Sequence, residues 1–179
     1  IGDNNIFREG VTIHRGTIQD KAVTKIGNDN LFMAYAHVAH DCIVGDSNVF
    51  ANSAGIAGHV EVGSFVTIGG FSAVHQFCIL GDYSFVGMNS SITMDVPAYV
   101  KVASNPARVI GLNSVGMSRN EISSESISLI KKAYKLVYKK GYRLEDAVNK
   151  LIMLSGESDD KFLDTFIKSI QSSTRGILR

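Results

Sequence analysis

Twelve consecutive blocks of six residues, from Ile26 to Pro97, each begin with a branched apolar or aromatic residue. The fifth place of every block holds a small or β-branched residue, such as Ala36 or Cys42. Neither an α-helix nor an ordinary strand has a period of six. Hexapeptide repeats are typical of a β-helix, in which each block forms one short strand and one corner and the stacked coils bury the block openers. We therefore predict a mainly β fold, a left-handed parallel β-helix with three blocks per coil, in which residues 18 apart lie above one another.

The repeat also predicts the domain organisation. We assign residues 1–100 to a partial left-handed β-helix and residues 101–179 to a connector and a small α-helical C-terminal domain. The period breaks at QDKAVTK, which predicts a loop insertion near residues 19–25. Such loops are favoured places for binding residues. Because the six-residue pattern is already running at Ile1, we expect an N-terminal truncation that has removed preceding coils.

Apolar spacing and capping residues predict the C-terminal elements. The stretch from Lys101 to Ile110 contains Pro106 and is predicted as a connector. Three amphipathic helices are expected after it, one capped by Ser123 or Ser124, one from about residue 144 to 154, and one beginning near residues 158–160.

The composition indicates a soluble cytoplasmic protein. The longest apolar runs are too short to span a bilayer, and no basic-then-apolar leader is present, so we expect no integral membrane segment. Cys42 and Cys78 occupy the small inward place of their blocks. This position predicts buried thiols in a reducing compartment rather than a disulfide or a nucleophile.

The net charge of +1 conceals an asymmetry between the two halves of the chain. Residues 1–97 carry four Lys and Arg against nine Asp and Glu, whereas residues 98–179 carry fourteen against eight. The basic half either steers an acidic partner or forms an ordinary solvated surface, and the sequence leaves both interpretations open. Nucleic acid is not expected as a partner, because acids lie among the lysines and no nucleic-acid motif is present.

Four of the five histidines lie within 39 residues. His40, Gly58 and Gln76 all occupy the third place of their blocks and are spaced 18 apart, which predicts one column on one edge of the β-helix. Asp41 and His59 are related in the same way. The repeat therefore brings together residues that are distant in sequence.

A histidine flanked by an aspartate suggests general-base catalysis, with the carboxylate orienting the ring. Adjacent residues on a strand point to opposite faces, so Asp41 reaches His40 only if a corner lies between them. Gly58 offers a backbone N–H that no side chain shields, as an oxyanion donor requires. Base and oxyanion donor on neighbouring coils are the groups that acyl transfer to a hydroxyl requires.

Two other interpretations of the histidines remain open. Histidines at β-helix corners are often polar surface residues without a chemical role. Three histidines near one edge could also hold zinc with one open position. Against zinc, His37, His59 and His75 occupy different places in their blocks and do not share a column, so we expect no metal.

Several segments resemble one family of hexapeptide acyltransferases. They are HRGT at 14–17, AHVAHDC at 36–42, AGHV at 57–60, GGFSAVHQFC at 69–78, DVPAYV at 95–100, GLN at 111–113, AYKLVY at 133–138 and STRGILR at 173–179. Together they are similar to the UDP-N-acetylglucosamine 3-O-acyltransferases, which perform the first step of lipid A biosynthesis. The similarity covers essentially the whole chain, and the HRGT and STRG segments separate this family from other hexapeptide acyltransferases.

The resemblance implies an activity and a set of partners. The expected reaction moves an R-3-hydroxyacyl group from acyl carrier protein to the 3-hydroxyl of UDP-N-acetylglucosamine, in a homotrimer whose sites lie between subunits. No cofactor is expected beyond the phosphopantetheine carried by the donor protein. An acidic carrier protein would also give the basic C-terminal half a partner.

The resemblance further implies roles for single residues. His40 is the expected general base, Asp41 orients it, and the Gly58 N–H receives the thioester oxyanion. The expected substrate-binding residues are His59 and Gln76 at the sugar, His37 and His75 near the nucleotide and acyl groups, and Asn113 and Arg119 at the nucleotide or the phosphopantetheine.

This chain departs from the family pattern in places that affect substrate contacts. Asn120 follows Arg119 where the family commonly has two arginines, and Val115 replaces a frequent acid. The sugar-binding Asp and Lys residues that the family carries before HRGT have no counterpart here. We therefore expect nucleotide or carrier contacts to differ, and acceptor binding to be weaker in a chain that begins at Ile1.

Met88 is the departure that concerns the acyl chain. It stands where many relatives carry glycine and where the residue acts as a ruler at the end of the acyl pocket. A methionine fills space that a longer chain needs. The expectation is a shorter donor, 3-hydroxydecanoyl rather than 3-hydroxymyristoyl, although a packing methionine without influence on length is the alternative.

Two further functions remain as competitors. The related N-acyltransferase of the same pathway acts on an amine and lacks the HRGT and STRG segments. A non-catalytic trimeric scaffold would keep the fold and the histidines without acyl transfer.

Overall fold

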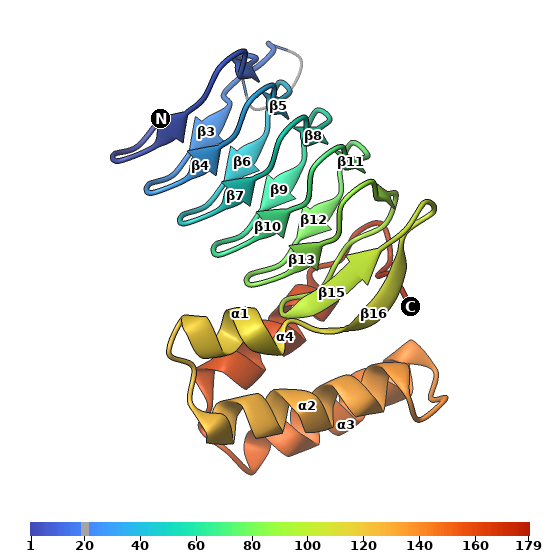
Figure 1. Cartoon of the computed structure of the whole chain (residues 1–179). Helices are drawn as coiled ribbons and strands as arrows, with labels where there is room; N and C mark the ends of the chain where they lie inside the picture. Colours follow the sequence, from blue (N-terminus) through green and yellow to red (C-terminus); the bar gives the residue numbers. More distant parts are fainter. Residues whose placement is uncertain (19–21) are drawn as a thin grey trace.

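The computed structural model describes residues 1–18 and 22–179 of the chain. It forms a parallel β-solenoid followed by helices, as the repeat predicts (Figure 1). Part of the predicted loop insertion, residues 19–21, lies outside the described residues. On either side of it, Thr12 pairs with His37, 25 residues away, whereas His37 pairs with Gly55 at the regular spacing of 18. The insertion therefore adds seven residues to one coil without disturbing the stack.

The described residues of the solenoid form three sheets, and successive strands pass from one sheet to the next. The first sheet contains, in spatial order, β1 (Ile6–Phe7), β4 (Leu31–Phe32), β7 (Val49–Phe50), β10 (Thr67–Ile68), β13 (Phe85–Val86), β15 (Val100–Ala103) and β16 (Arg108–Leu112). The second contains β2 (Thr12–Ile13), β5 (His37–Val38), β8 (Gly55–Ile56), β11 (Ala73–Val74) and β14 (Ser91–Ile92). The third contains β3 (Lys25–Ile26), β6 (Ile43–Val44), β9 (Glu61–Val62) and β12 (Ile79–Leu80).

The core of the solenoid consists of the two residue columns that the period identifies. Every block opener from Ile26 to Ile92 is at most 3% exposed, and so is every fifth-place residue from Asn30 to Val96. The few polar side chains among them form a ladder between coils, because Asn30 accepts from the Asn48 N–H and Asn48 accepts from the Val66 N–H. The core prediction is confirmed.

The corners depend on a backbone conformation that residue types alone do not reveal. The fourth residue of each block from Asp29 to Asn89 has a positive φ, between 52° and 65°. Phe65 and Phe71 are among them, although bulky side chains seldom adopt this left-handed region. Because the corner reverses the direction in which consecutive side chains point, two adjacent residues at a corner can face each other.

One prediction about the connector is wrong. The sequence predicts a connector over residues 101–110, but β15 joins the first sheet in parallel register with β13, and β16 pairs with β15 in an antiparallel hairpin. The pairing across the sheet edge stabilises extended backbone on both sides of Pro106, which itself lies in the turn between the strands.

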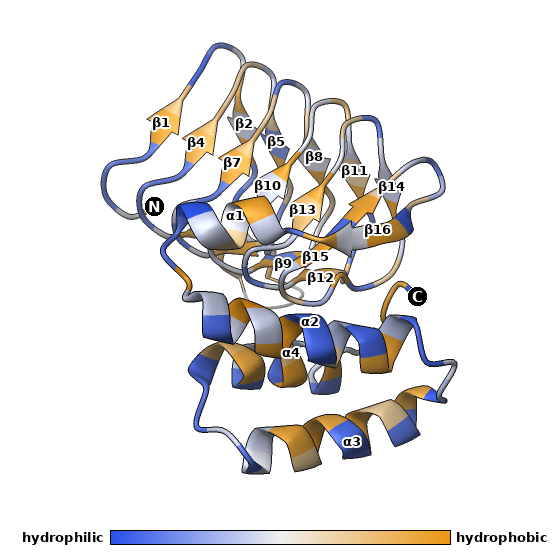
Figure 2. Ribbon diagram, turned by 60° about the horizontal axis from the view of Figure 1, so that its bottom comes forward, coloured by the Kyte–Doolittle hydropathy of each residue, from blue (hydrophilic) through white to orange (hydrophobic). Residues whose placement is uncertain are grey.

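In the described part of the chain, four helices follow the solenoid, and three of them match the predicted segments. They are α1 (Ser114–Arg119), α2 (Ser124–Tyr138), α3 (Leu144–Gly156) and α4 (Lys161–Gln171). Ser123 caps α2 as predicted, and Asp160 caps α4 by accepting from two main-chain N–H groups. The short helix α1 was not predicted. Hydrophobic and hydrophilic residues alternate around α2 and α4, which bury one face each (Figure 2).

The C-terminal tail returns to the solenoid. The Asp95 carboxylate accepts hydrogen bonds from the Ser173 hydroxyl at 2.6 Å and from the main-chain N–H groups of Thr174 and Arg175. Within the described residues, no helix is both long and apolar enough to cross a membrane.

Candidate active site

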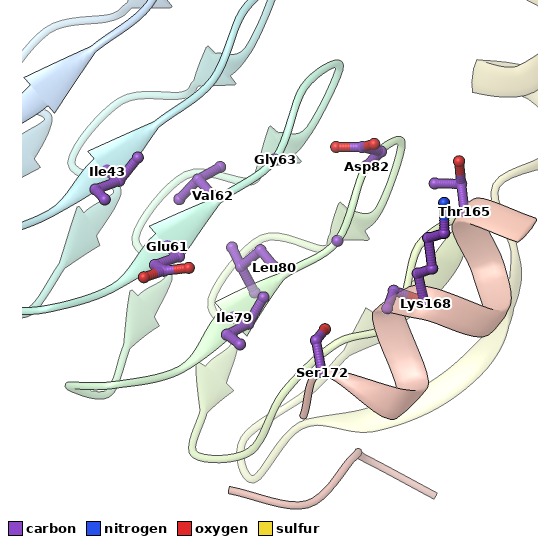
Figure 3. Close-up of a pocket in the computed structure, with 12 residues that line it drawn as sticks. Ile43, Glu61, Val62, Gly63, Ile79, Leu80, Asp82, Thr165, Lys168 and Ser172 are labelled. Atoms are coloured by element: carbon purple, nitrogen blue, oxygen red, sulfur yellow. The ribbon is translucent and has the colours of Figure 1, made fainter. Parts of the chain in front are cut away.

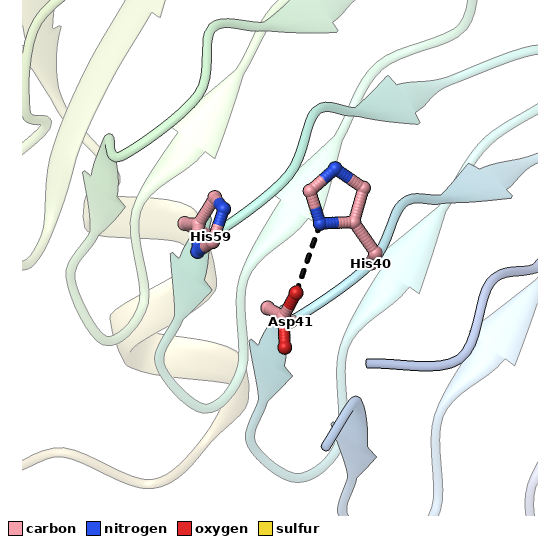
Figure 4. A group of neighbouring side chains, drawn as sticks. All are labelled: His40, Asp41 and His59. Atoms are coloured by element: carbon pink, nitrogen blue, oxygen red, sulfur yellow. Dashed lines mark hydrogen bonds and ion pairs between the residues drawn. The ribbon is translucent and has the colours of Figure 1, made fainter. Parts of the chain in front are cut away.

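His40 and Asp41 meet at a corner between the second and third sheets (Figure 4). Their contact joins His40 Nδ1 to Asp41 Oδ2 at 2.9 Å. Asp41 has a φ of 59°, and this left-handed turn brings its side chain to the same side as that of its neighbour. The Asp41 side chain is completely buried, whereas 41% of the His40 side chain is exposed. The predicted corner is therefore present, and it leaves the imidazole of His40 partly exposed.

The charge state of Asp41 follows from its surroundings. Burial by itself raises the pKa of this carboxyl, but hydrogen bonds from Thr17 and His40 lower it more, and the net pKa is about 2. An ionised carboxylate only accepts hydrogen bonds. His40 Nδ1 must therefore donate, so the neutral ring carries its proton on Nδ1 and has its lone pair on Nε2.

Gly58 lies directly above His40, as the spacing of 18 predicts. The His59 N–H donates to the His40 carbonyl, and the Phe77 N–H donates to the Gly58 carbonyl, which places three coils in one stack. A Cβ on Gly58 would lie 2.7 Å from His40 Cε1 and 2.8 Å from Nε2. Glycine is thus required for the ring to pack here. The Gly58 N–H has no acceptor among the described residues.

His59 forms the second wall of this corner. Its ring meets that of His40 edge to face, with centroids 5.1 Å apart, and stacks on Phe77 at 4.5 Å. His40, Asp41 and His59 each offer a ligand atom within 4.8 Å of the others, so among the described residues this trio could hold a metal ion. It is a different set from the three histidines considered in the sequence. His75 and Gln76 lie exposed on the next coil, where His75 Nδ1 contacts the Gln76 carbonyl at 3.1 Å.

His37 lies on β5, next to His14. Their ring centroids are 4.7 Å apart, and His37 Nδ1 lies 2.7 Å from Thr12 Oγ1. Burial lowers the pKa of His37, and the charge of His14 lowers it further. The sequence prediction included His37 but overlooked Thr12 and His14 as its neighbours, although His14 opens the HRGT segment. The insertion hides the pairing of Thr12 with His37 from the sequence pattern, because it lengthens their spacing from 18 to 25 residues.

The other predicted residues do not meet the His40 corner within one chain. Asn113 is buried, caps α1 by accepting from the Gly116 N–H, and donates to the Tyr83 carbonyl. Tyr83 lies in the column of Phe65, at a different corner of the solenoid. Arg119 is exposed at the end of α1. Met88 is 72% exposed, so its side chain lines no enclosed pocket of the single chain.

A cavity of about 390 Å³ lies elsewhere (Figure 3). It lies between the third sheet and α4, with Ile43, Ile79 and Lys168 among its lining residues. None of the predicted site residues lines it.

Comparison with known proteins identifies the family of the chain. Residues 95–178 match the family described as UDP N-acetylglucosamine O-acyltransferase, domain 2, and residues 24–58 match the bacterial transferase hexapeptide family. The acyl-[acyl-carrier-protein]–UDP-N-acetylglucosamine O-acyltransferase of Pseudomonas paraeruginosa is 49% identical over 181 residues, which span all of this chain and 69% of that protein. The enzyme of the same name from Pseudomonas putida is 46% identical.

Solved structures give the same result. The UDP-N-acetylglucosamine O-acyltransferase of Moraxella catarrhalis superposes with a TM-score of 0.94 at 47% identity, covering 98% of this chain and 68% of that one. A structure from Acinetobacter baumannii has a TM-score of 0.94 at 45% identity and covers 99% and 69%. Because the similarity extends over the whole chain at nearly half identity, the chain belongs to the family of UDP-N-acetylglucosamine O-acyltransferases.

Proposed function

We propose that this chain transfers an R-3-hydroxyacyl group from acyl carrier protein to the 3-hydroxyl of UDP-N-acetylglucosamine, the first step of lipid A biosynthesis. The observation that carries the proposal is the arrangement of His40, Asp41 and Gly58 at one corner. Family membership supports the choice of substrates. The reaction needs no cofactor other than the phosphopantetheine arm of the donor.

The chemistry follows from the atoms at the corner. His40 Nε2 takes the proton of the sugar 3-hydroxyl, and the oxygen attacks the thioester carbonyl carbon. The carbonyl oxygen becomes an oxyanion and accepts a hydrogen bond from the Gly58 N–H. When the tetrahedral intermediate collapses, the C–S bond breaks and the thiolate leaves with the proton that Nε2 held. Asp41 stabilises the charged imidazole between the two proton transfers.

His59 and Gln76 extend from the same edge and would contact the sugar, with His37 and His75 close to the nucleotide and acyl groups. Asn113 and Arg119 lie away from this corner in one chain. We propose that the active protein is a cytoplasmic homotrimer whose sites lie between subunits, so that a second subunit brings these residues to the cleft. Analytical ultracentrifugation tests the assembly, since a monomer with full activity would contradict it.

His40→Ala is the direct test of the function. We expect acyl transfer to fall by at least about a thousandfold, while the folded structure persists, because the base is lost and the buried Asp41 carboxylate, with a pKa of about 2, is too weak a base to replace it. Circular dichroism checks the fold, and radiolabelled UDP-N-acetylglucosamine measures transfer. Unchanged activity would refute the assignment of the base and favour a scaffold. Bound zinc at one ion per site, measured after purification, would favour a metal site formed by the trio instead.

The donor length is a finer proposal. We propose that Met88 shortens the acyl pocket formed between subunits, and that 3-hydroxydecanoyl is preferred to 3-hydroxymyristoyl. An exposed methionine is available to line such a pocket. In a competition between the two acyl carrier proteins, we expect the shorter donor to react faster, and Met88→Gly to reverse the order. Equal or faster transfer of the longer chain by the unmodified protein would contradict this proposal.

A further inference from the structure

Thr17, the last residue of the HRGT segment, contacts the candidate catalytic pair through Asp41. We propose that Thr17 is a positioning residue, which holds the Asp41 carboxylate in the orientation that fixes the ring of His40. The kinetic consequences of this inference rest on the proposed function, whereas the contacts of Thr17 with Asp41 are independent of it.

Thr17 donates most of the hydrogen bonds that the Asp41 carboxylate accepts. The Thr17 main-chain N–H lies 3.1 Å from Oδ1 and 3.0 Å from Oδ2, and its hydroxyl donates to Oδ2 at 2.7 Å. The remaining donor to this carboxylate among the described residues is His40 Nδ1, which also approaches Oδ2. A completely buried carboxylate needs such donors, because it has no water to replace them.

The shared oxygen is what makes the arrangement directional. Thr17 Oγ1 and His40 Nδ1 both point at Oδ2, so the hydroxyl holds this oxygen at one place relative to the ring. Without the hydroxyl, only the main-chain N–H of Thr17 holds the carboxylate on this side, and Oδ2 is fixed less firmly against the ring. Thr17 therefore acts on the reacting Nε2 atom only through Asp41 and Nδ1.

The seven-residue insertion explains how Thr17 reaches this position. The chain leaves the regular coil at Thr17 and returns at Thr24, whose hydroxyl accepts from the Asp41 main-chain N–H at 2.9 Å. A Cβ on Gly16 would clash with the main-chain N of Val23, so the two ends of the insertion approach each other closely. Both ends of the insertion thus hold Asp41, one at its carboxylate and one at its backbone.

Thr17→Val tests the role, because valine keeps the shape and the main-chain N–H but removes the hydroxyl. We expect kcat to fall roughly tenfold to a hundredfold, the effect of one hydrogen bond to a charged group, with KM within about twofold. Thr17→Ser, which restores the hydroxyl, should recover most of kcat. Thr67→Val, in β10 on another sheet, is the matched control for the substitution itself and should leave kcat and KM unchanged.

Nitrogen NMR of histidine-labelled protein separates positioning from general stability. The unmodified protein should show neutral His40 protonated on Nδ1, with a strong hydrogen bond to Oδ2. Thr17→Val should keep this tautomer but shift the Nδ1 resonance, because Oδ2 is held less firmly against the ring. A Thr17→Val protein that keeps its kcat, or that loses kcat with an unshifted Nδ1 resonance, would overturn the proposal. If the unmodified protein transfers no acyl group, the proposed function fails, but the comparison of Nδ1 resonances still decides the role of Thr17.

Discussion

One buried carboxylate decides which nitrogen of His40 is free to react. Asp41 is ionised because its hydrogen bonds outweigh its burial, and an ionised carboxylate binds the ring only through an N–H. The lone pair is thereby assigned to Nε2. A lysine or arginine beside Asp41 would also keep the carboxylate ionised, but its positive charge would repel protonated His40. The neutral donors of Thr17 keep Asp41 ionised without that repulsion.

The pair of His14 and His37 predicts a pH effect at the residue scale. The pKa of His37 is lowered by burial first and by His14 second, so protonation of His37 favours the unfolded chain. The contribution of His37 to stability is therefore present above its ordinary pKa of about 6.5 and is lost as the pH falls below that value. His14→Asn should raise the pKa of His37, measured by proton NMR of the ring. His75→Asn is the control, and an unmoved His37 titration in His14→Asn would contradict the coupling.

The two thiols give a second prediction at this scale. Cys42 and Cys78 are free and completely buried, and burial is the main cause that raises the pKa of each to about 11. At pH 8 the native protein should therefore take up no iodoacetamide within an hour, and both thiols should react in denaturant. Mass spectrometry counts the added groups, and rapid labelling of either cysteine in the native protein would show that the core opens.

At the scale of elements, α2 presents a basic face. Lys131, Lys132, Lys135, Lys139 and Lys140 are exposed along one helix and its end. Lys131, Lys135 and Lys139 follow one another at intervals of four, an arrangement of like charges that costs helix stability. An acidic partner such as acyl carrier protein would offset the repulsion between these lysines. This arrangement favours the interpretation that the basic half of the chain binds an acidic partner.

Charge reversal tests this face. Lys131→Glu with Lys135→Glu should raise KM for the acyl carrier protein about tenfold at low salt and leave kcat nearly unchanged, because exposed charges act mainly on encounter. The difference should shrink as salt screens the charges. Arg8→Glu with Arg108→Glu makes the same change in net charge on the solenoid and the hairpin. An equal effect of both pairs would indicate a general charge effect rather than a docking face.

At the scale of the whole molecule, the chain ends by returning to the solenoid. Asp95 is 1% exposed, and its Oδ1 accepts from the Ile79 N–H while its Oδ2 receives Ser173, Thr174 and Arg175. The main chain adds the bond from the Leu178 N–H to the Asp95 carbonyl. The STRGILR segment therefore attaches the C-terminal end of the chain to the last coils of the solenoid through Asp95.

Removing the Asp95 carboxylate, which accepts the hydrogen bonds of the tail, should destabilise the whole chain. We expect Asp95→Ala to lower the free energy of unfolding by about 3 kcal/mol, since several buried N–H groups lose their acceptor. Urea unfolding followed by circular dichroism measures the change. Asp159→Ala removes an exposed acid and should have little effect. A loss below about 1 kcal/mol in Asp95→Ala would show that the tail contributes little to stability.

The sequence by itself determined the stack and its columns. A period of six dictates which residues enter the core, and three blocks per coil place Gly58 above His40, because both properties depend only on local repetition. Tertiary structure decided what repetition does not encode. The left-handed corner that turns Asp41 toward His40, the contact of Thr17 across the insertion, and the use of Asn113 as a helix cap depend on neighbours distant in sequence. Residues 101–110 form a hairpin for the same reason. The sheet edge at β13 offers unpaired main-chain groups, and this hydrogen bonding cannot be predicted from the local sequence.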